Sequence, residues 1–561
     1  MSEPARNPVK AEAYTPKLLT VFREGYSVAA FRADAIAGLT VAIVALPLAM
    51  ALGIASGASP DKGLITAVVA GFLISALGGS RVQVGGPTGA FVVVIFNVIA
   101  SHGYDGLLIA TLLAGLILIA AGLLRFGQMI KYIPHPVVTG FTAGIAVIIA
   151  SSQVKDFFGL AIDEVPADFL PKWQAYLGAL SSANWAAIGV GAGALAIIVA
   201  LRKFAPRLPG FLIAVVVSSL AVALLNLPVD TIGSRFPDIP AGLPVPSFPD
   251  ISLVKINAVL PSAFTIAFLA GIEALLSAVV ADGMAGTRHR SNQELIGQGV
   301  ANLGSALFGG LPATGAIART ATNIRSGAKT PVAGMMHAAF LLVFILFGTD
   351  LMAYVPMAAL AAILFMVAWG MSEYQRFLAL LRMPNSDRAV LLITFGLTVL
   401  VDLTVAIAVG VTLASLLFMA RMAEAVEVDR SGRRDAELDA EDLDQRDDLP
   451  PGVEVFRIAG PFFFGVAGEL LDTLRRVGQS PRVIILRMRL VPLLDASGAQ
   501  ALEEFVQQAR LAGAQVIVSG VQPQPRAMLG RIGLGEAAGR IAYAADYAGA
   551  QALAIDLAGA K

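Results

Sequence analysis

The sequence contains no cysteine and few charged residues, and these shortages exclude several classes of protein. Without cysteine, neither a disulfide nor a Cys-ligated zinc or iron–sulfur site can form, and four scattered histidines cannot build a His-rich metal centre. We therefore expect no metal and no cofactor. The 40 Lys and Arg residues balance the 40 Asp and Glu residues, so no basic surplus indicates nucleic acid as a partner. The charged content of 14% is far below the roughly 25% of soluble proteins, which argues against a soluble enzyme.

Hydrophobic residues are correspondingly abundant. They make up 57% of the 561 residues. Charges are sparse over residues 1–428, where 47 occur, and denser over residues 429–561, where 33 occur. This asymmetry indicates a large membrane region followed by a small soluble one. The predicted parts are a cytoplasmic N-terminal segment (1–30), a transmembrane transport domain (31–425), an acidic linker (426–452) and a cytoplasmic α/β domain (453–561).

Apolar runs of about 20 residues, the length that spans a bilayer, follow one another from Phe31 onward. Two shorter apolar segments, 88–100 and 314–324, follow Gly/Pro-rich stretches and are predicted to be half-spans. With the full spans they make fourteen segments of an α-helical membrane protein. The full spans are predicted near 33–57, 63–80, 106–124, 136–157, 184–201, 210–227, 256–281, 292–308, 330–348, 354–372, 386–402 and 403–421.

The charges in the predicted loops indicate the orientation of the spans, because cytoplasmic loops carry an excess of Lys and Arg. Alternate loops of this chain are rich in Lys and Arg or rich in Asp and Glu. Assigning the basic loops to the cytoplasm places both termini in the cytoplasm. Lys172, Arg235 and Lys255 are the minority cations of the outer loops. The inner loops hold Arg125, Lys131, Arg202, Lys203, Arg207, Arg288, Arg290, Arg325, Lys329, Arg376, Arg382 and Arg388, and the outer loops hold Asp163, Glu164, Asp168, Asp230, Asp238 and Asp250.

The two half-spans begin alike. Residues 88–90 and 314–316 both read Thr-Gly-Ala after a Gly/Pro break, and each half-span is third in a set of seven, so the second set is inverted relative to the first. A helix that begins at mid-membrane leaves N–H groups unpaired and its positive dipole end exposed. Two such ends facing each other would bind an anion. The alternative is that these glycines only permit close helix packing.

Three ionisable residues lie within or beside predicted spans, where charge is costly and usually functional. Arg319, in the second half-span, is predicted to bind the anion with its planar guanidinium. The alternative for Arg319 is a structural ion pair with Glu273 or a side chain that extends to the interface. Glu273 is predicted to carry the coupling proton, or else to be a fixed counter-charge. Asp402, at a span junction, is interpreted as a capping or hinge residue, and His289 and His337 as loop and packing residues.

The membrane region also contains longer runs with a recognisable pattern. They occupy 37–51, 84–88, 132–141, 280–284, 292–299 and 323–330. These runs resemble the sulfate-permease (SulP) family of anion transporters over about residues 30–425. The resemblance implies a seven-plus-seven inverted repeat of fourteen spans with core and gate domains, a C-terminal STAS domain, and a homodimer.

The resemblance also implies a substrate site between the half-spans. Glu273 matches an acidic sodium ligand of sodium-coupled bicarbonate members, but Ile317 stands where those members have a hydroxyl-bearing ligand. Leu48 follows Pro47 where many members have Gln. Glu273 with residues 316–319 is more similar to the bacterial, proton-linked dicarboxylate branch. The implied substrate-binding residues are Thr88, Gly89, Ala90, Gly315, Ala316, Ile317 and Arg319.

The C-terminal region alternates predicted strands and helices, which indicates a small α/β domain. The run from Asp495 to Gly498 resembles the STAS signature. That match implies that Ser497 could be phosphorylated, as in stand-alone STAS regulators, and the alternative is that Ser497 caps a helix. The expected strands are 453–458, 483–487 and 516–520, and the expected helices are 467–477, 498–512 and a short or frayed one over 549–561.

These patterns favour secondary active transport of a small oxyanion across the bacterial inner membrane, with proton-coupled uptake of a C4-dicarboxylate as the first interpretation. The alternatives are sulfate uptake, sodium-coupled bicarbonate uptake, an anion channel on the same fold, or a membrane sensor whose output is the STAS domain. No Gly-x-x-x-x-Gly-Lys-Ser/Thr run is present, so ATP-driven transport is not expected. The expected partners are the anion, protons or sodium, membrane lipid and a second copy of the chain.

Overall fold

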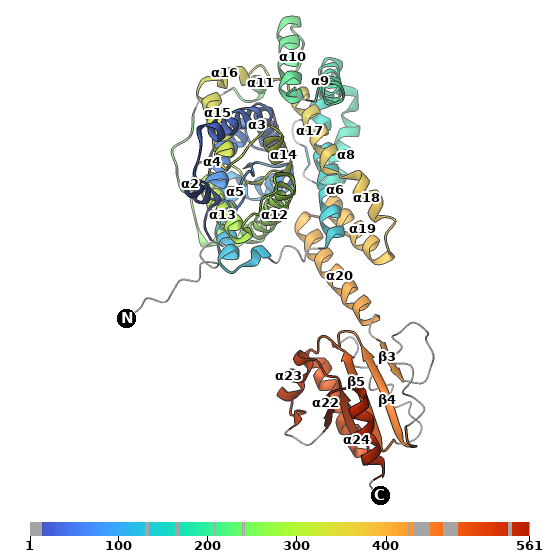
Figure 1. Cartoon of the computed structure of the whole chain (residues 1–561). Helices are drawn as coiled ribbons and strands as arrows, with labels where there is room; N and C mark the ends of the chain where they lie inside the picture. Colours follow the sequence, from blue (N-terminus) through green and yellow to red (C-terminus); the bar gives the residue numbers. More distant parts are fainter. Residues whose placement is uncertain are drawn as a thin grey trace. The chain divides into compact units, whose positions relative to one another are not determined.

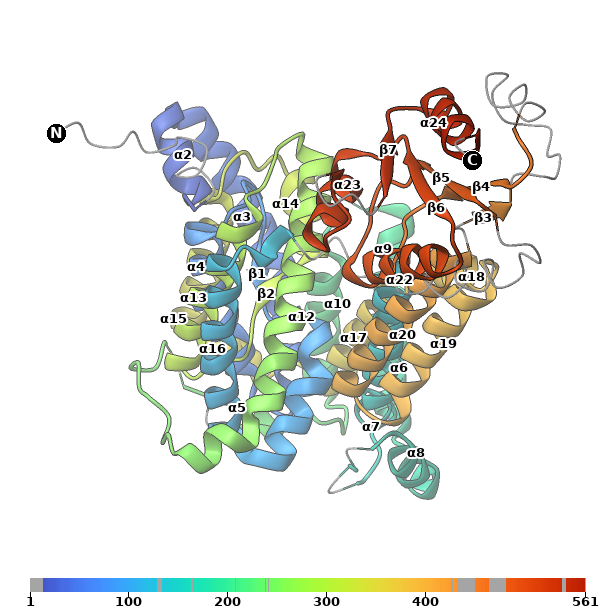
Figure 2. The same cartoon turned by 90° about the horizontal axis from the view of Figure 1, so that it is seen from below.

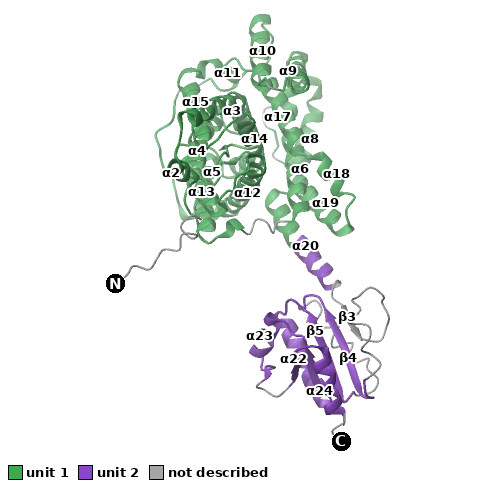
Figure 3. Cartoon of the chain, viewed as in Figure 1, with its two compact units in different colours: residues 1–412 green, residues 413–561 purple. Residues whose placement is uncertain are grey.

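The computed structural model divides into two units, residues 1–412 and residues 413–561 (Figure 3). The boundary falls within helix α20 (Leu403–Glu424), which belongs in part to each unit. The structure describes residues 14–128, 134–162, 165–166, 168–206, 208–237, 239–240, 242–424, 427–430, 449–463, 481–536 and 541–559.

The first half of the membrane unit supplies seven membrane segments. Gly103, with φ of 69° and ψ of −179°, separates the half-helix at the start of α5 from the full helix that follows it. The elements are α3 (Val28–Ala55), α4 (Pro60–Leu77), η1 (Gly89–Phe91) continuing into α5 (Val92–Leu123), α6 (His135–Ser152), α9 (Trp185–Phe204) and α10 (Gly210–Leu225).

The second half repeats this order, with α14 as its half-helix. Among the described residues, eight helices are long and apolar enough to cross a membrane, and α10 and α15 are shorter apolar helices. The predicted helical membrane fold with two half-helices is confirmed. The elements are α12 (Leu253–Ala285), α13 (Ser291–Leu307), α14 (Ile317–Arg325), α15 (Val332–Phe347), α17 (Met357–Met371), α19 (Asn385–Leu400) and α20.

Short helices before and between the spans are not predicted from the sequence. Each is too short to cross a bilayer at 1.5 Å per residue, and apolar runs of span length do not reveal them. They are α2 (Lys17–Glu24), α7 (Val154–Phe158), α8 (Phe169–Gly178), η3 (Leu180–Ser182), α11 (Ile232–Arg235), α16 (Thr349–Met352) and α18 (Tyr374–Leu380).

The membrane helices form two bundles (Figures 1 and 2). In the first, which we call the core bundle, α13 packs against α5 and α4, α15 packs against α3 and α4, and α12 packs against α5 and α14. In the second, which we call the gate bundle, α19 packs against α6, and α17 packs against α6 and α9. Each bundle therefore combines helices from both halves of the chain.

Glycines allow the core helices to approach closely. A Cβ on Gly63 of α4 would collide with the carbonyl group of Ala49 on α3, and one on Gly53 would lie 2.9 Å from the carbonyl oxygen of Ser59. Helices in lipid associate mainly through such close packing, because the surrounding acyl chains are as apolar as leucine. Some of the many glycines in this chain therefore serve packing alone.

The C-terminal unit is the predicted small α/β domain. Its described sheet has five strands in the order β3-β4-β5-β6-β7. Strands β4 to β7 are parallel to their neighbours, and β3 is antiparallel to β4. The elements are β3 (Glu427–Arg430), β4 (Val453–Ala459), β5 (Val483–Leu490), α22 (Ala496–Leu511), β6 (Gln515–Ser519), α23 (Pro523–Arg531), β7 (Ala542–Ala544) and α24 (Tyr547–Gly559).

Two apolar clusters hold this sheet between its helices. Phe456 and Phe505 belong to the cluster that includes α22, and Ile485 and Ala554 belong to the cluster that includes α24. The predicted terminal helix is confirmed as α24. The prediction of a simple tether over 426–452 is wrong for its first residues, because β3 pairs with β4 there. The helix predicted over 467–477 lies outside the described residues.

Candidate anion-binding site

The two half-helices begin at one short ladder inside the core bundle (Figure 2). Strand β1 (Gly85–Gly86) pairs antiparallel with β2 (Thr314–Gly315), with Gly85 opposite Gly315. Because the strands are antiparallel, the chain leaves the ladder in opposite directions, into η1 on one side and α14 on the other. The ladder therefore brings together residues 88–90 and 315–317, which the sequence analysis assigns to the site.

The first turns of both half-helices have unpaired backbone donors. The N–H groups of Gly89, Ala90, Ile317 and Ala318 donate to no carbonyl oxygen of the described residues, as expected for helix starts. The N–H of Ala316 is not available, because it donates to the Val84 carbonyl at 2.9 Å. Unpaired N–H groups and two positive dipole ends in one place favour an anion.

Arg319 is buried beside the ladder from which both half-helices begin. Its side chain is only 3% exposed, and its guanidinium donates from Nη2 to the Pro87 carbonyl and from Nη1 to the Gly85 carbonyl at 3.4 Å. A guanidinium has five N–H donors, so at most three remain for an anion. The predicted fork is thus partly used to hold the β1 segment, and the positive charge is fixed beside the start of the first half-helix.

Glu273 contacts the first half-helix rather than Arg319. Its Oε2 accepts a hydrogen bond of 2.9 Å from the Thr88 hydroxyl. None of the ion pairs within 4.0 Å among the described residues joins Glu273 to Arg319. The alternative of a direct structural pair between them is therefore wrong in this conformation. Glu273 instead has a direct link to the residue that precedes the unpaired N–H groups.

The two site glycines have different surroundings. A Cβ on Gly315 would collide with the amide of Gln83, so its space is filled by a side chain and not left open for an anion. A Cβ on Gly89 would lie 2.6 Å from Sδ of Met371 and 3.2 Å from Cδ1 of Ile149. Met371 and Ile149 belong to the gate bundle, so the first half-helix begins at the contact between the two bundles.

Gly86 has a backbone requirement of its own. Its φ of 145° is unfavourable for other residues, and a Cβ there would lie 2.5 Å from Nη1 of Arg319. Ile317, by contrast, is 42% exposed and presents an apolar side chain beside its unpaired N–H. The exposed Ile317 offers no oxygen for a sodium ion.

Buried polar side chains that the sequence patterns did not single out fix the ladder. The Thr320 hydroxyl accepts from the Val84 N–H at 3.1 Å, and Asn302 pairs with both the N–H and the carbonyl of Ala313 at 2.9 Å. Gln83 donates to the Ala274 carbonyl at 3.1 Å. Asn302 lies within a predicted span, where a buried polar side chain is a signal that could have identified it. Gln83 lies between predicted spans and Thr320 has polar neighbours, so neither has such a signal.

Glu294 is a buried carboxylate that was likewise not singled out from the sequence. It accepts from the N–H groups of Gly79 and Ser80 at 2.8 and 3.0 Å and from the Gln298 amide at 2.8 Å. These contacts satisfy the loop between α4 and β1. Glu294 therefore holds the loop that leads into the ladder.

The remaining ionisable candidates have local roles. Asp402 accepts from the Val405 N–H at 3.0 Å at the start of α20, which confirms the capping interpretation. His289 lies in a loop and pairs with Asp282 at 2.7 Å. His337 is buried in α15 among packed helices. Among the described residues, no group of three or more His, Asp or Glu side chains could hold a metal ion.

Ser497 lies at the start of α22, but it is not the cap. Asp495 accepts from the Gly498 N–H at 2.7 Å and is the N-cap, so the capping alternative for Ser497 is wrong. Asp495 takes this role because its carboxylate at the N-cap satisfies an unpaired N–H and the helix dipole. Ser497 is exposed.

Comparison with known protein families agrees with this architecture. The sulfate permease family matches residues 31–394, and the STAS domain matches residues 447–542. The chain belongs to the sulfate permease family. Transport, and not enzymatic catalysis, is what members of this family do.

Curated relatives cover nearly the whole chain. It is 41% identical over 514 residues to "Putative sulfate transporter YvdB" of Bacillus subtilis, covering 91% of this chain and 95% of that protein. It is 33% identical over 520 residues to "Bicarbonate transporter BicA" of Picosynechococcus, covering 90% and 91%. Neither name mentions a dicarboxylate, so the comparisons support the family and not the dicarboxylate branch.

Solved structures show the same fold. The transmembrane domain of a cyanobacterial bicarbonate transporter BicA matches with a TM-score of 0.61 and 32% identity, over 70% of this chain and 98% of that chain. Murine Slc26a9 in the inward-facing state matches with a TM-score of 0.86 and 18% identity, over all of this chain and 96% of that chain. The second match shows the fold alone.

Proposed function

We propose that this protein transports a small inorganic oxyanion, sulfate or bicarbonate, across the bacterial plasma membrane by secondary active transport. One observation carries the proposal. Two half-helices begin at one ladder, and N–H groups in their first turns have no backbone acceptor among the described residues. The buried guanidinium of Arg319 lies beside them. This arrangement attracts an anion without a catalytic group.

The relatives favour an inorganic anion over a C4-dicarboxylate. Sulfate comes first, because the relative with 41% identity has sulfate in its name. Bicarbonate comes second, because BicA shares both 33% sequence identity and the membrane fold. Sulfate is divalent and gains more than bicarbonate from each positive charge near the site.

The contact between the two bundles suggests how the anion crosses. Gly89 of the core bundle lies against Met371 and Ile149 of the gate bundle. Movement of one bundle against the other would open the helix starts to one face of the membrane and then to the opposite face. This is alternating access around a site that remains in the core bundle.

Glu273 is our candidate for the residue that couples anion transport to a proton gradient. Its hydrogen bond to Thr88 joins its charge to the first half-helix, so protonation would alter the site beside the anion. A proton would reduce the repulsion between the Glu273 carboxylate and an incoming anion. We favour a proton over sodium, because Ile317 provides no oxygen ligand beside the site.

The proposal extends to the orientation, assembly and regulation of the transporter. Both termini would be cytoplasmic, as the loop charges indicate, and two copies would form a homodimer. The STAS domain would regulate transport from the cytoplasm, with the exposed Ser497 as its candidate phosphorylation site at a helix N-terminus.

Reconstitution of the purified full chain tests the proposal. Liposomes would be offered sulfate, bicarbonate and a C4-dicarboxylate, each with a pH gradient, a sodium gradient or neither. We expect uphill accumulation of sulfate or bicarbonate with the pH gradient alone. Flux that only dissipates the anion gradient would indicate a channel, and uptake restricted to the dicarboxylate would contradict the choice of substrate.

A further inference from the structure

A cavity of about 250 Å³ lies beside the first half-helix, away from the ladder. The end of α3 and the first turns of α5 line it from the core bundle, and α6 lines it from the gate bundle, together with the short helices α7 and α8. Its lining includes Val92, one helical turn beyond Thr88, and Ile148, the neighbour of the Ile149 that faces Gly89. The cavity therefore lies between the bundles, on the side of the site where α3 ends.

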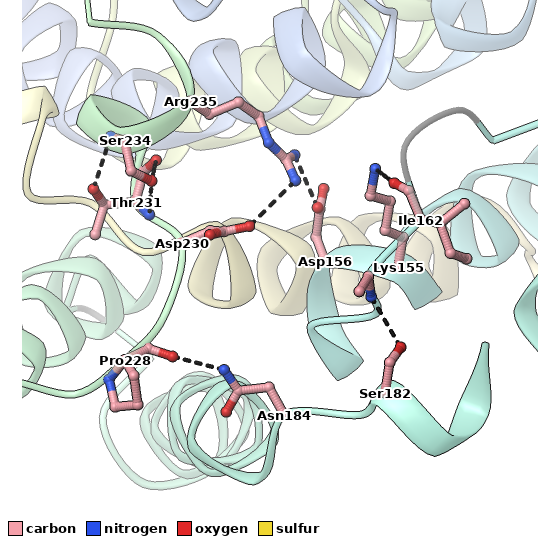
Figure 4. Close-up of polar contacts among 11 residues, drawn as sticks. Lys155, Asp156, Ile162, Ser182, Asn184, Pro228, Asp230, Thr231, Ser234 and Arg235 are labelled. Atoms are coloured by element: carbon pink, nitrogen blue, oxygen red, sulfur yellow. Dashed lines mark hydrogen bonds and ion pairs between the residues drawn. The ribbon is translucent and has the colours of Figure 1, made fainter.

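The charged lining residues carry a positive surplus. Lys155, Lys172 and Arg235 are cations, and Asp156 is the one carboxylate among the described lining residues. Arg235 neutralises Asp156 through an ion pair of 2.9 Å and also reaches toward Asp230 (Figure 4). Among the described residues, neither Lys155 nor Lys172 forms an ion pair with a carboxylate within 4.0 Å.

The two lysines differ in what their ammonium groups contact. Lys155 donates to the carbonyl of Ile162 (Figure 4). Lys172 has no hydrogen-bond acceptor among the described residues, and its Nζ lies 5.5 Å from the centre of the Phe96 ring. Its residue is only 4% exposed. Lys172 is therefore a buried cation that is aimed into a cavity and stabilised only in part.

The hydroxyl of Tyr176, one turn along α8 from Lys172, is also buried without a hydrogen-bond acceptor among the described residues. Tyr176 lines the cavity, is buried, and its OH has no hydrogen-bond partner in the described part of the chain. Residues four apart on a helix lie on one face, so Lys172 and Tyr176 present an ammonium and a hydroxyl together. Trp173 anchors this helix by donating to the Ser151 hydroxyl at 3.2 Å.

A buried polar group without a partner is costly, and a charged one more so. Burial lowers the pKa of the Lys172 ammonium from its usual range, and the Asp168 carboxylate offsets this shift only in part. An anion in the cavity would accept hydrogen bonds from both groups and offset the cost. Charge-assisted hydrogen bonds of this kind are the stronger ones.

We propose that this cavity is a second anion site, an entrance in which Lys172 and Tyr176 bind the oxyanion before it reaches the half-helices. The inference rests on the proposed function. It assigns the entrance to the membrane face where α3 and α6 end, which the loop charges indicate is the outer face. The anion is bound there by side chains, whereas at the half-helices it is bound by backbone N–H groups.

The test uses the full chain in liposomes, with sulfate supplied to one face at a time. Lys172→Met keeps most of the length of the side chain and removes its charge. We expect the KM for sulfate supplied at the α3-end face to rise about tenfold, with kcat nearly unchanged and with the KM from the opposite face unchanged. Lys172→Arg should keep a near-normal KM. Lys255→Met, in an exposed pair with Asp250, is the matched control and should leave both values unchanged.

Tyr176→Phe provides a second variant if Lys172→Met does not fold, and we expect a smaller rise in the same KM. An unchanged KM in folded Lys172→Met, or a rise that is equal from both faces, would overturn the inference. If the wild type moves neither sulfate nor bicarbonate, the proposed function fails instead. In that case sulfate binding at the cavity is measured by Trp173 fluorescence, in a protein in which Trp185 and Trp369 are replaced by Phe. A fluorescence response to sulfate that Lys172→Met does not diminish would overturn the proposed second anion site.

Discussion

Replacing Arg319 separates its two roles, because it both supports the ladder and supplies charge to the anion. In Arg319→Ala the hydrogen bonds to the carbonyls of Pro87 and Gly85 are lost. A hydrogen bond from a charged donor contributes about 1.5–3 kcal/mol, and the bond to Gly85, at 3.4 Å, contributes little. We therefore expect a loss of about 2–3 kcal/mol of stability, which leaves a folded protein with a lower Tm.

The effect on the anion comes from the lost charge. The Arg319 guanidinium donates to the carbonyl of Pro87, two residues before the unpaired N–H of Gly89, so its charge lies on the order of 6 Å from an anion bound at that helix start. A unit charge at about 6 Å gains roughly 3 kcal/mol at an effective dielectric constant of about 20. That corresponds to about a hundredfold weaker binding of a monovalent anion in Arg319→Ala, and a larger loss for sulfate.

The assay is uptake of labelled sulfate over a range of low concentrations, beside thermal unfolding of the same purified protein. Arg319→Lys keeps the charge and loses the planar fork, so its affinity should fall less than that of Arg319→Ala. Arg325→Ala, at the exposed end of α14, is the matched control and should behave like the wild type. A wild-type KM for Arg319→Ala, with or without a lower Tm, would refute the electrostatic role.

Three other substitutions test neighbouring features. Glu273→Gln should keep sulfate exchange and lose accumulation driven by a pH gradient; accumulation that persists would exclude Glu273 as the proton carrier. Gly315→Val should lower the Tm and the yield, because the valine side chain collides with Gln83. Adding Gln83→Ala to the same chain should restore part of both. A Gly315→Val protein as stable as the wild type would contradict the close packing of Gln83 on Gly315. Asp495→Ala should destabilise the start of α22 by about 1 kcal/mol, seen as faster amide exchange there in the full chain, whereas Ser497→Ala should not; equal effects would mean that Asp495 is not the cap.

The sequence by itself determined the membrane spans, because span length and apolarity are local properties that the bilayer imposes. It also located both half-helices, since a Gly/Pro break followed by Thr-Gly-Ala is visible in each half of the chain. Arg319 and Glu273 stood out for the same reason, as charges within apolar runs. The family followed from longer runs of the same segments and was confirmed by comparison.

Only the tertiary structure decided what these residues contact. Glu273 bonds to Thr88 and not to Arg319, and Gly315 makes room for Gln83, although each pair is far apart in sequence. Lys172 lies in a helix of ten residues, and its burial follows from the packing of α8 against α6 and α19 and of its ammonium over Phe96 of α5. Hydrophobicity sets which segments enter the membrane, but hydrogen bonds and close contacts between distant segments set the geometry of a site. Those contacts leave no periodic pattern in the sequence.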